Sequence, residues 1–210
     1  MSEFSIEARG VSCERDQRLL LDGVNCAVGP GEVLQIAGAN GSGKTTLLRI
    51  LVGISTAYEG QVLWCGQPIA AAAGQYYSQL LYLGHNPGVT LTLSALENLR
   101  WYFQLNQIVA DQRMREALAA LGLDGYEDVP AYRMSAGQQR RIALARLLIS
   151  DAPLWILDEP FTAIDRGGVQ ELEQLICRHA RQGGAVILTT HHALNLDVPF
   201  DRLELAGAPC

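Results

Sequence analysis

One glycine-rich segment has the residue types and spacing that hold phosphate groups. It matches the pattern GxxxxGK[ST] in full, with an apolar run before it and a helical pattern after it, which disfavours a chance match in a glycine-rich turn. Glycines let the backbone wrap closely around phosphate oxygens, and the start of the next helix adds positive potential. The segment reads Gly38-Ala39-Asn40-Gly41-Ser42-Gly43-Lys44-Thr45, followed by Thr46.

Two residues of this loop carry side chains that would act on a nucleotide. We expect Lys44 to reach the β- and γ-phosphates of ATP and to take part in catalysis. The hydroxyl of Thr45 is expected to bind Mg²⁺. ATP and Mg²⁺ are therefore the predicted cofactors.

Two neighbouring carboxylates follow an apolar run at residues 154–157. Such a run predicts a buried strand, and ligands of open α/β sheets bind at the carboxyl ends of the strands. We expect Asp158 to hold Mg²⁺ through water and Glu159 to orient or deprotonate an attacking water. Because Pro160 comes next, the alternative is that both carboxylates only cap a turn.

A third segment, residues 134–141, reads Met-Ser-Ala-Gly-Gln-Gln-Arg-Arg and precedes an apolar helical pattern. Ser135 and Gln138 have the spacing of a capping box, which alone would account for both. A helix that begins Ser-Ala-Gly is also an anion site, so Ser135, Gly137 and Gln138 are candidate nucleotide contacts. The chain already has a phosphate loop, and capping does not explain this second site.

In their order along the chain, the phosphate loop, residues 134–141 and the acidic strand end resemble the motifs of ABC-type ATPases, and the resemblance covers nearly the whole chain. Residues 134–141 resemble the signature motif, whose commonest form is Leu-Ser-Gly-Gly-Gln; Met134 and Ala136 depart from it. The resemblance implies a homodimer, in which Ser135 and Gly137 of one subunit bind the ATP held by the other.

Two later segments also match this family. Residues 161–165, Phe-Thr-Ala-Ile-Asp, resemble the D-loop that crosses the dimer interface. Thr189-Thr190-His191 resembles the switch region, whose histidine contacts the γ-phosphate, and the resemblance implies a catalytic role for His191. The neighbouring His192 fits the family spacing less well. Without the other motifs, a histidine at this place would be an ordinary polar strand end.

Two further positions depart from the family pattern. After the strand that we expect at residues 80–84, the family has a glutamine that contacts Mg²⁺ and water. Counting back from residues 97–98 places His85 there, so the resemblance implies a metal contact for His85, with Asn86 as the open alternative. The family also stacks an aromatic residue on adenine from the first hairpin. Here Arg15 is a candidate through its guanidinium plane.

Several stretches are similar to one branch of the family, the ATP-binding subunits of the heme exporter in bacterial cytochrome c maturation. That resemblance implies integral membrane partners, a peripheral place on the cytoplasmic face of the inner membrane, and heme release to a periplasmic chaperone. No direct heme binding is expected, and the substrate would contact the membrane subunits. Other ABC transporters and a soluble ABC ATPase remain alternatives. The stretches are residues 13–16, 62–64, 66–69, 82–88 and 93–99.

The elements that must position these residues alternate between strand-like and helical patterns. This order predicts an α/β P-loop NTPase domain of the ABC type with a mostly parallel core sheet. We expect strands at 4–8 and 19–28 to form an antiparallel edge. Helical patterns at 93–105, 111–121 and 136–150 predict an inserted helical subdomain at about 86–150 of one domain, 1–210. The remaining expected elements are strands at 33–37, 62–64, 80–83, 154–157 and 185–189, and helices at 45–52 and 169–181.

Composition limits the classes of function. Of the 210 residues 49% are hydrophobic and 18% charged, as in folded domains. A net charge of −6 argues against nucleic acid as a partner, because phosphate binding needs a basic field. No apolar run reaches the length of a membrane span, and the five scattered cysteines predict reduced thiols rather than a metal site. The aromatic residues at 101–103 either dock a partner helix or fill the helical core.

Overall fold

The structure is a computed structural model, and it describes residues 4–15, 17–104 and 108–206. Its contacts divide the chain into two compact units. The sheet unit comprises the described residues up to Tyr82, with 152–159 and 173–206. The helical unit comprises the described residues of 83–151, with 160–172. Helix α6 (Arg166–Arg181) begins in the helical unit and ends in the sheet unit.

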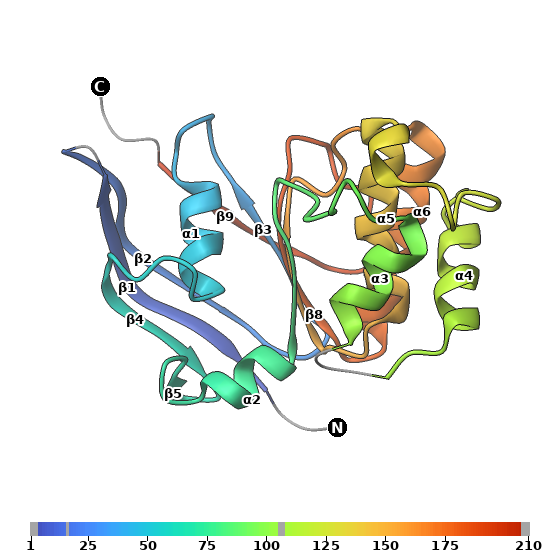
Figure 1. The fold of residues 1–210 in the computed structure, drawn as a ribbon. Coiled ribbons are helices and arrows are strands. Elements are labelled where there is room, and N and C mark those ends of the chain that lie inside the picture. The colour runs from blue at the N-terminus through green and yellow to red at the C-terminus, as the bar shows by residue number, and fades with distance from the viewer. Residues whose placement is uncertain (1–3, 16, 105–107, 207–210) are drawn as a thin grey trace. The chain divides into compact units, whose positions relative to one another are not determined.

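The core of the sheet unit is a five-stranded sheet in the order β6-β7-β8-β3-β9; Figure 1 labels three of these strands, β8, β3 and β9. Its three central strands are buried along their whole length and pair in parallel, as apolar runs without alternation predict. The edge strand β9 also pairs with β3 in parallel. The strands are β6 (Leu80–Leu83), β7 (Leu154–Asp158), β8 (Ala185–Thr189), β3 (Val33–Ala37) and β9 (Asp201–Glu204).

The predicted antiparallel edge is a second sheet of the same unit, in the order β2-β1-β4-β5. Its first two strands run further than the sequence predicted, because irregular pairings between Ala8 and Glu14 let β1 continue to Arg15. The strands are β1 (Ile6–Arg15), β2 (Arg18–Val28), β4 (Glu59–Trp64) and β5 (Gln67–Pro68).

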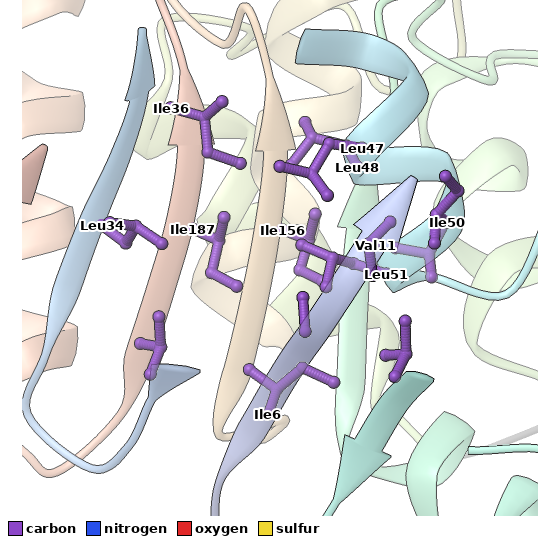
Figure 2. Packing of buried hydrophobic residues seen from close by; sticks show 14 of the residues in the cluster. Ile6, Val11, Leu34, Ile36, Leu47, Leu48, Ile50, Leu51, Ile156 and Ile187 are labelled. Carbon is purple, nitrogen blue, oxygen red and sulfur yellow. The ribbon is translucent and has the colours of Figure 1, made fainter. Parts of the chain in front are cut away.

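Helix α1 (Lys44–Leu51) packs its apolar side against the parallel sheet. Leu47, Leu48 and Leu51 were expected to face inward, and all three are fully buried. Figure 2 shows the two leucines of its first turn beside Ile156 of β7, with Val11 of β1 close to the end of the helix. The phosphate loop that precedes α1 is therefore fixed at both ends, by a buried strand and by a buried helix.

The helical unit contains α3 (Ala95–Phe103), α4 (Asp111–Ala120), the short 3₁₀ helix η1 (Ala131–Arg133) and α5 (Ala136–Ile149). Helix α3 begins later than predicted because Ser94 caps it with Glu97 in a capping box. The last predicted residue, Leu105, lies outside the described part of the chain. Phe103 fills the helical core as one of the two alternatives predicted, whereas Trp101 is exposed and its docking to a partner helix stays a prediction.

Four short elements were absent from the sequence prediction: β5, α2 (Ala73–Ser78), η1 and β9. Helix α2 has one fully buried residue, Tyr76, whose hydroxyl donates to Leu51 O at 2.7 Å. Among the described residues no helix is both long and apolar enough to span a bilayer, and Cys13, Cys26, Cys65 and Cys177 are free thiols. Cys210 lies outside the described residues.

Candidate nucleotide site

The phosphate loop joins β3 to α1 and leaves no space for side chains at two of its glycines. Gly43 caps α1 with φ 94°, and Gly38 has φ 142°, both in the region that favours glycine. A Cβ atom at Gly38 would lie 2.5 Å from Ser42 Oγ and 2.8 Å from Leu205 O. The loop must therefore present its backbone, which is the arrangement that a phosphate needs.

The polar side chains of the loop are held inside it. Lys44 is buried, and its Nζ donates to Gly38 O at 2.8 Å and to Ala39 O at 2.9 Å. The Oγ atom of Ser42 is buried and has no hydrogen-bond partner within the part of the chain that the structure describes. A buried hydroxyl without a partner is costly, and a phosphate oxygen would remove that cost.

Asp158 ends β7 beside the loop, where two hydroxyl groups donate to one of its oxygens. Thr45 Oγ1 lies 3.2 Å and Thr189 Oγ1 2.7 Å from Asp158 Oδ1. Strand register explains the second contact, because Asp158 and Thr189 pair directly across β7 and β8. The sequence predicts Thr189 only as part of the segment that resembles the switch region, and its bond to Asp158 was not predicted. The pairing of two parallel strand ends was the signal that could have found it.

The donor set at Thr45 and Asp158 suits a magnesium ion. Mg²⁺ prefers oxygen ligands, takes one or two carboxylates and fills its other positions with water and substrate phosphates. A threonine hydroxyl and a carboxylate beside the phosphate loop meet that preference. The prediction for His85 fits less well chemically, because an imidazole nitrogen is a poor ligand for this ion.

Tyr82 also belongs to this region of the sheet unit. Burial raises the pKa of its hydroxyl, and the charge of Asp158 adds to the effect, while Arg49 lowers it. The phenol therefore stays protonated at neutral pH and can donate a hydrogen bond.

Glu159 and His191 come from neighbouring strand ends and lie against each other. The backbone N–H of His191 donates to Glu159 Oε2 at 3.3 Å, and His191 Nε2 lies 3.6 Å from Glu159 Oε1. Glu159 has a left-handed backbone, with φ 49°, and its N–H donates to Thr189 O and Oγ1 at 3.1 and 3.0 Å. Backbone strain of this kind is concentrated at functional sites.

The start of α5 belongs to the helical unit and has the predicted capping box. Ser135 Oγ accepts from Gln138 N at 3.2 Å, and Gln138 Oε1 accepts from Ser135 N at 2.9 Å. Gly137 lies close to the segment that resembles the D-loop, where a Cβ atom would come within 2.9 Å of Ala163 O. Glycine is needed here for the close approach of two backbones.

Two arginines of α5 bind other segments of the helical unit, the D-loop-like segment and the backbone at residues 84–85. Arg141 Nη2 lies 2.8 Å from Asp165 Oδ2, in the D-loop-like segment. Arg140 is buried, and its Nη1 donates to Gly84 O at 3.1 Å and to His85 O at 3.4 Å. Helix α5 thus fixes the backbone at His85, whatever ligand its side chain takes.

The predicted site residues therefore divide between the two units. The structure brings Lys44, Thr45, Asp158, Glu159 and His191 into the sheet unit, at the carboxyl ends of parallel strands. The remaining candidates, Ser135, Gly137, Gln138 and His85, belong to the helical unit. Among the residues that the structure describes, no three His, Cys, Asp or Glu side chains form a metal-binding group.

Comparison with known proteins agrees with this geometry. The family model described as ABC transporter matches residues 21–162. The cytochrome c biogenesis ATP-binding export protein CcmA of Escherichia coli K12 is 52% identical over 191 residues, 91% of each chain. The protein of the same name from Saccharophagus degradans is 51% identical over 197 residues, 90% of this chain and 87% of that protein.

Solved structures share the fold. An ABC transporter ATP-binding protein from Pyrococcus furiosus has a TM-score of 0.80 and 25% identity, and the match covers 96% of this chain and 97% of that one. An ATP-binding cassette, solved as a dimer after hydrolysis with ADP and Pi, has a TM-score of 0.78 and 24% identity, covering 89% and 88%. The chain belongs to the ABC transporter family, within its group of cytochrome c biogenesis ATP-binding export proteins.

Proposed function

We propose that this chain binds Mg-ATP at the loop 38–45 and hydrolyses it with Glu159 and His191. The observation that carries the proposal is the contact between these two side chains beside the Thr45–Asp158 pair. A bound Mg²⁺ would neutralise phosphate charge as the bond breaks, held by Thr45 and Asp158. Lys44 would turn from the loop carbonyls to the β- and γ-phosphates.

Glu159 and His191 would act on the attacking water and on the γ-phosphate. The left-handed backbone of Glu159 directs its carboxylate toward the end of β8. There it can accept a proton from water, while the exposed ring of His191 can donate a hydrogen bond to a phosphate oxygen.

We propose that the working unit is a homodimer. The chain has a second anion-binding helix start, at α5, in addition to the phosphate loop. Ser135, Gly137 and Gln138 would bind the ATP held by the other copy. The capping box supports this role because it fixes the first turn of α5. The Ser135 Oγ atom accepts one hydrogen bond in it and keeps its O–H donor and a second lone pair for a ligand.

The names of the similar proteins, cytochrome c biogenesis ATP-binding export proteins, extend the proposal to a biological role. We propose that the dimer drives integral membrane subunits from the cytoplasmic face of the inner membrane, and that the complex exports heme or releases it to a periplasmic chaperone during cytochrome c biogenesis. The chain itself would not bind heme, because substrate contacts belong to the membrane subunits.

The variant Glu159→Gln tests the catalytic part of this proposal. Glutamine keeps the size of the side chain and an oxygen for the His191 N–H, but it cannot take a proton. We expect hydrolysis to fall about 10²- to 10⁴-fold, while Mg-ATP binding persists and an ATP-bound dimer accumulates in size-exclusion chromatography.

A Lys44→Ala variant separates an ATPase from a nucleotide-binding scaffold. We expect it to lose Mg-dependent hydrolysis without forming the stable dimer. A Glu159→Gln protein that hydrolyses ATP at the normal rate and stays monomeric would overturn the mechanism. If the Lys44→Ala variant and the wild-type chain show the same Mg-dependent hydrolysis, the result would favour the scaffold.

A further inference from the structure

The segment that follows His191 is tied to α6 by one buried carboxylate. Glu173 is only 7% exposed, and its Oε1 accepts from the backbone N–H of Asn195 at 2.8 Å. The same oxygen lies 3.2 Å from His192 Nε2. All these residues belong to the sheet unit. One carboxylate oxygen therefore fixes the segment at two points, three residues apart.

A third bond holds the start of this segment, residues 190–195, which we call the 190–195 turn. Thr190 is buried, and its Oγ1 accepts from His192 N at 2.9 Å. His191 lies between these two anchored residues. The turn is therefore fixed immediately before and after the residue that contacts Glu159.

The side chain of His191 depends on this backbone for its direction. It is 60% exposed, and its described polar contacts are with Glu159 alone. A ring with so much freedom is placed mainly by its Cα–Cβ bond. A shift of about 1 Å in a positioning group can cost up to about 10²-fold in rate, so the anchors around His191 bear on the reaction.

The position of Glu173 is unusual for a carboxylate. The buried side of this part of α6 is otherwise apolar, and it includes Leu172, Ile176, Cys177 and Ala180. Burying a carboxylate is costly unless hydrogen bonds compensate, and an apolar residue would pack here without that cost. Its two contacts, with His192 and with Asn195 N–H, compensate for the burial. They also indicate that the charge of Glu173 serves to hold this turn.

We propose that Glu173 is a positioning residue for ATP hydrolysis, which holds the 190–195 turn through His192 and Asn195 so that His191 meets the γ-phosphate. The proposal rests on the role of His191 proposed above. The bonds of Glu173 are with His192 and Asn195, which lie outside the phosphate loop, so we expect its effect on the rate to pass through His191.

A double-mutant cycle of ATPase activity in the full-length chain tests this proposal. Glu173→Ala should lower kcat about tenfold with KM for ATP changed less than twofold, because the turn loosens while the phosphate loop is intact. In a His191→Ala background the same change should lower kcat no further. Glu173→Gln keeps an acceptor for Asn195 N–H and should recover most of the rate.

Two further variants separate positioning from folding. His192→Ala removes the partner of Glu173 at a half-exposed site, so the chain should fold normally and kcat should fall about threefold. Glu171→Ala, two residues away on α6 and exposed, is the matched control and should behave as wild type.

The outcomes are distinct. Equal losses from Glu173→Ala in both backgrounds, or full activity of Glu173→Ala and His192→Ala, would overturn the positioning role. If His191→Ala itself hydrolyses ATP normally, the proposed function of His191 fails first and the role of Glu173 falls with it. Should Glu173→Ala not fold, the His192→Ala result, measured in both backgrounds, decides in the same way.

Discussion

Replacement of Thr189 by valine would test the bond that orders the acidic strand end. Thr189 is fully buried, and its hydroxyl donates to Asp158 Oδ1 at 2.7 Å and accepts from Glu159 N at 3.0 Å. Valine has the same shape and suits a strand, so the change removes the hydroxyl and little else.

The expected loss of stability follows from what remains bonded. A hydrogen bond to a charged group contributes about 1.5–3 kcal/mol. The Glu159 N–H keeps Thr189 O at 3.1 Å, and Asp158 Oδ1 keeps Thr45 Oγ1 at 3.2 Å, so neither group loses its last partner. We therefore expect the lower part of the range, about 2 kcal/mol in the free energy of unfolding, or a fall in Tm of about 4–8 °C at this chain length.

The same substitution should weaken magnesium binding. Residues that orient a metal ligand commonly change metal affinity about 10- to 100-fold when removed. We expect about tenfold more Mg²⁺ to be needed for half-maximal ATPase activity, measured beside urea unfolding of the same protein. Thr189→Ser keeps the hydroxyl and is the control. A valine variant as stable as wild type, with unchanged Mg²⁺ dependence, would refute this account.

Two other predictions concern the proposed anion site at the start of α5 and the end of α6. Gly137→Ala would place a Cβ atom 2.9 Å from Ala163 O, so ATP-dependent dimer formation should fall at least about tenfold while one copy still binds ATP, as sedimentation and nucleotide titration would show. Burial lowers the pKa of His179 from 6.5 to about 4, so the unfolded chain takes up the proton first and the free energy of unfolding should fall as pH drops from 6.5 to 4. We expect a loss of about 2 kcal/mol in the free energy of unfolding, allowing for partial exposure. The variant His179→Phe keeps a ring on Trp155 but cannot take up a proton, so urea unfolding should show that it has lost most of this pH dependence.

The central strands and the phosphate loop could be predicted because their signals are local. A short, continuous apolar run such as that of β7 is stable only when it is buried, as in a central parallel strand. The glycine pattern of the loop indicates a backbone that wraps around phosphate. The edge strand β9 has no such signal, since Asp201, Arg202 and Glu204 are exposed and the strand exists only through its pairing with β3. Helix α2 begins at Ala73, and its N-cap residue Ala72 has no side chain that could cap it, so its start has no signature either.

Two residues with proposed roles, Thr189 and Glu173, could not be identified from the sequence because their bonding partners lie far along the chain. Thr189 meets Asp158 across 31 positions, and Glu173 meets His192 across 19. Neither bond can be read from spacing, because each depends on strand register or on how α6 packs in the sheet unit. The capping box of Ser135 is local, and for that reason it was predicted correctly.

The backbone of Glu159 connects these observations to the reaction. A left-handed conformation costs a residue other than glycine about 1–2 kcal/mol, and a glycine would adopt it freely. The chain has a carboxylate there instead, and its N–H is held by both oxygens of Thr189. Because the same Thr189 hydroxyl donates to Asp158, one residue fixes the proposed magnesium ligand and the proposed base together. The strained backbone of Glu159 is therefore held by the residue that also holds Asp158, and in our proposal the bonds of Glu173 position His191, which contacts the Glu159 carboxylate.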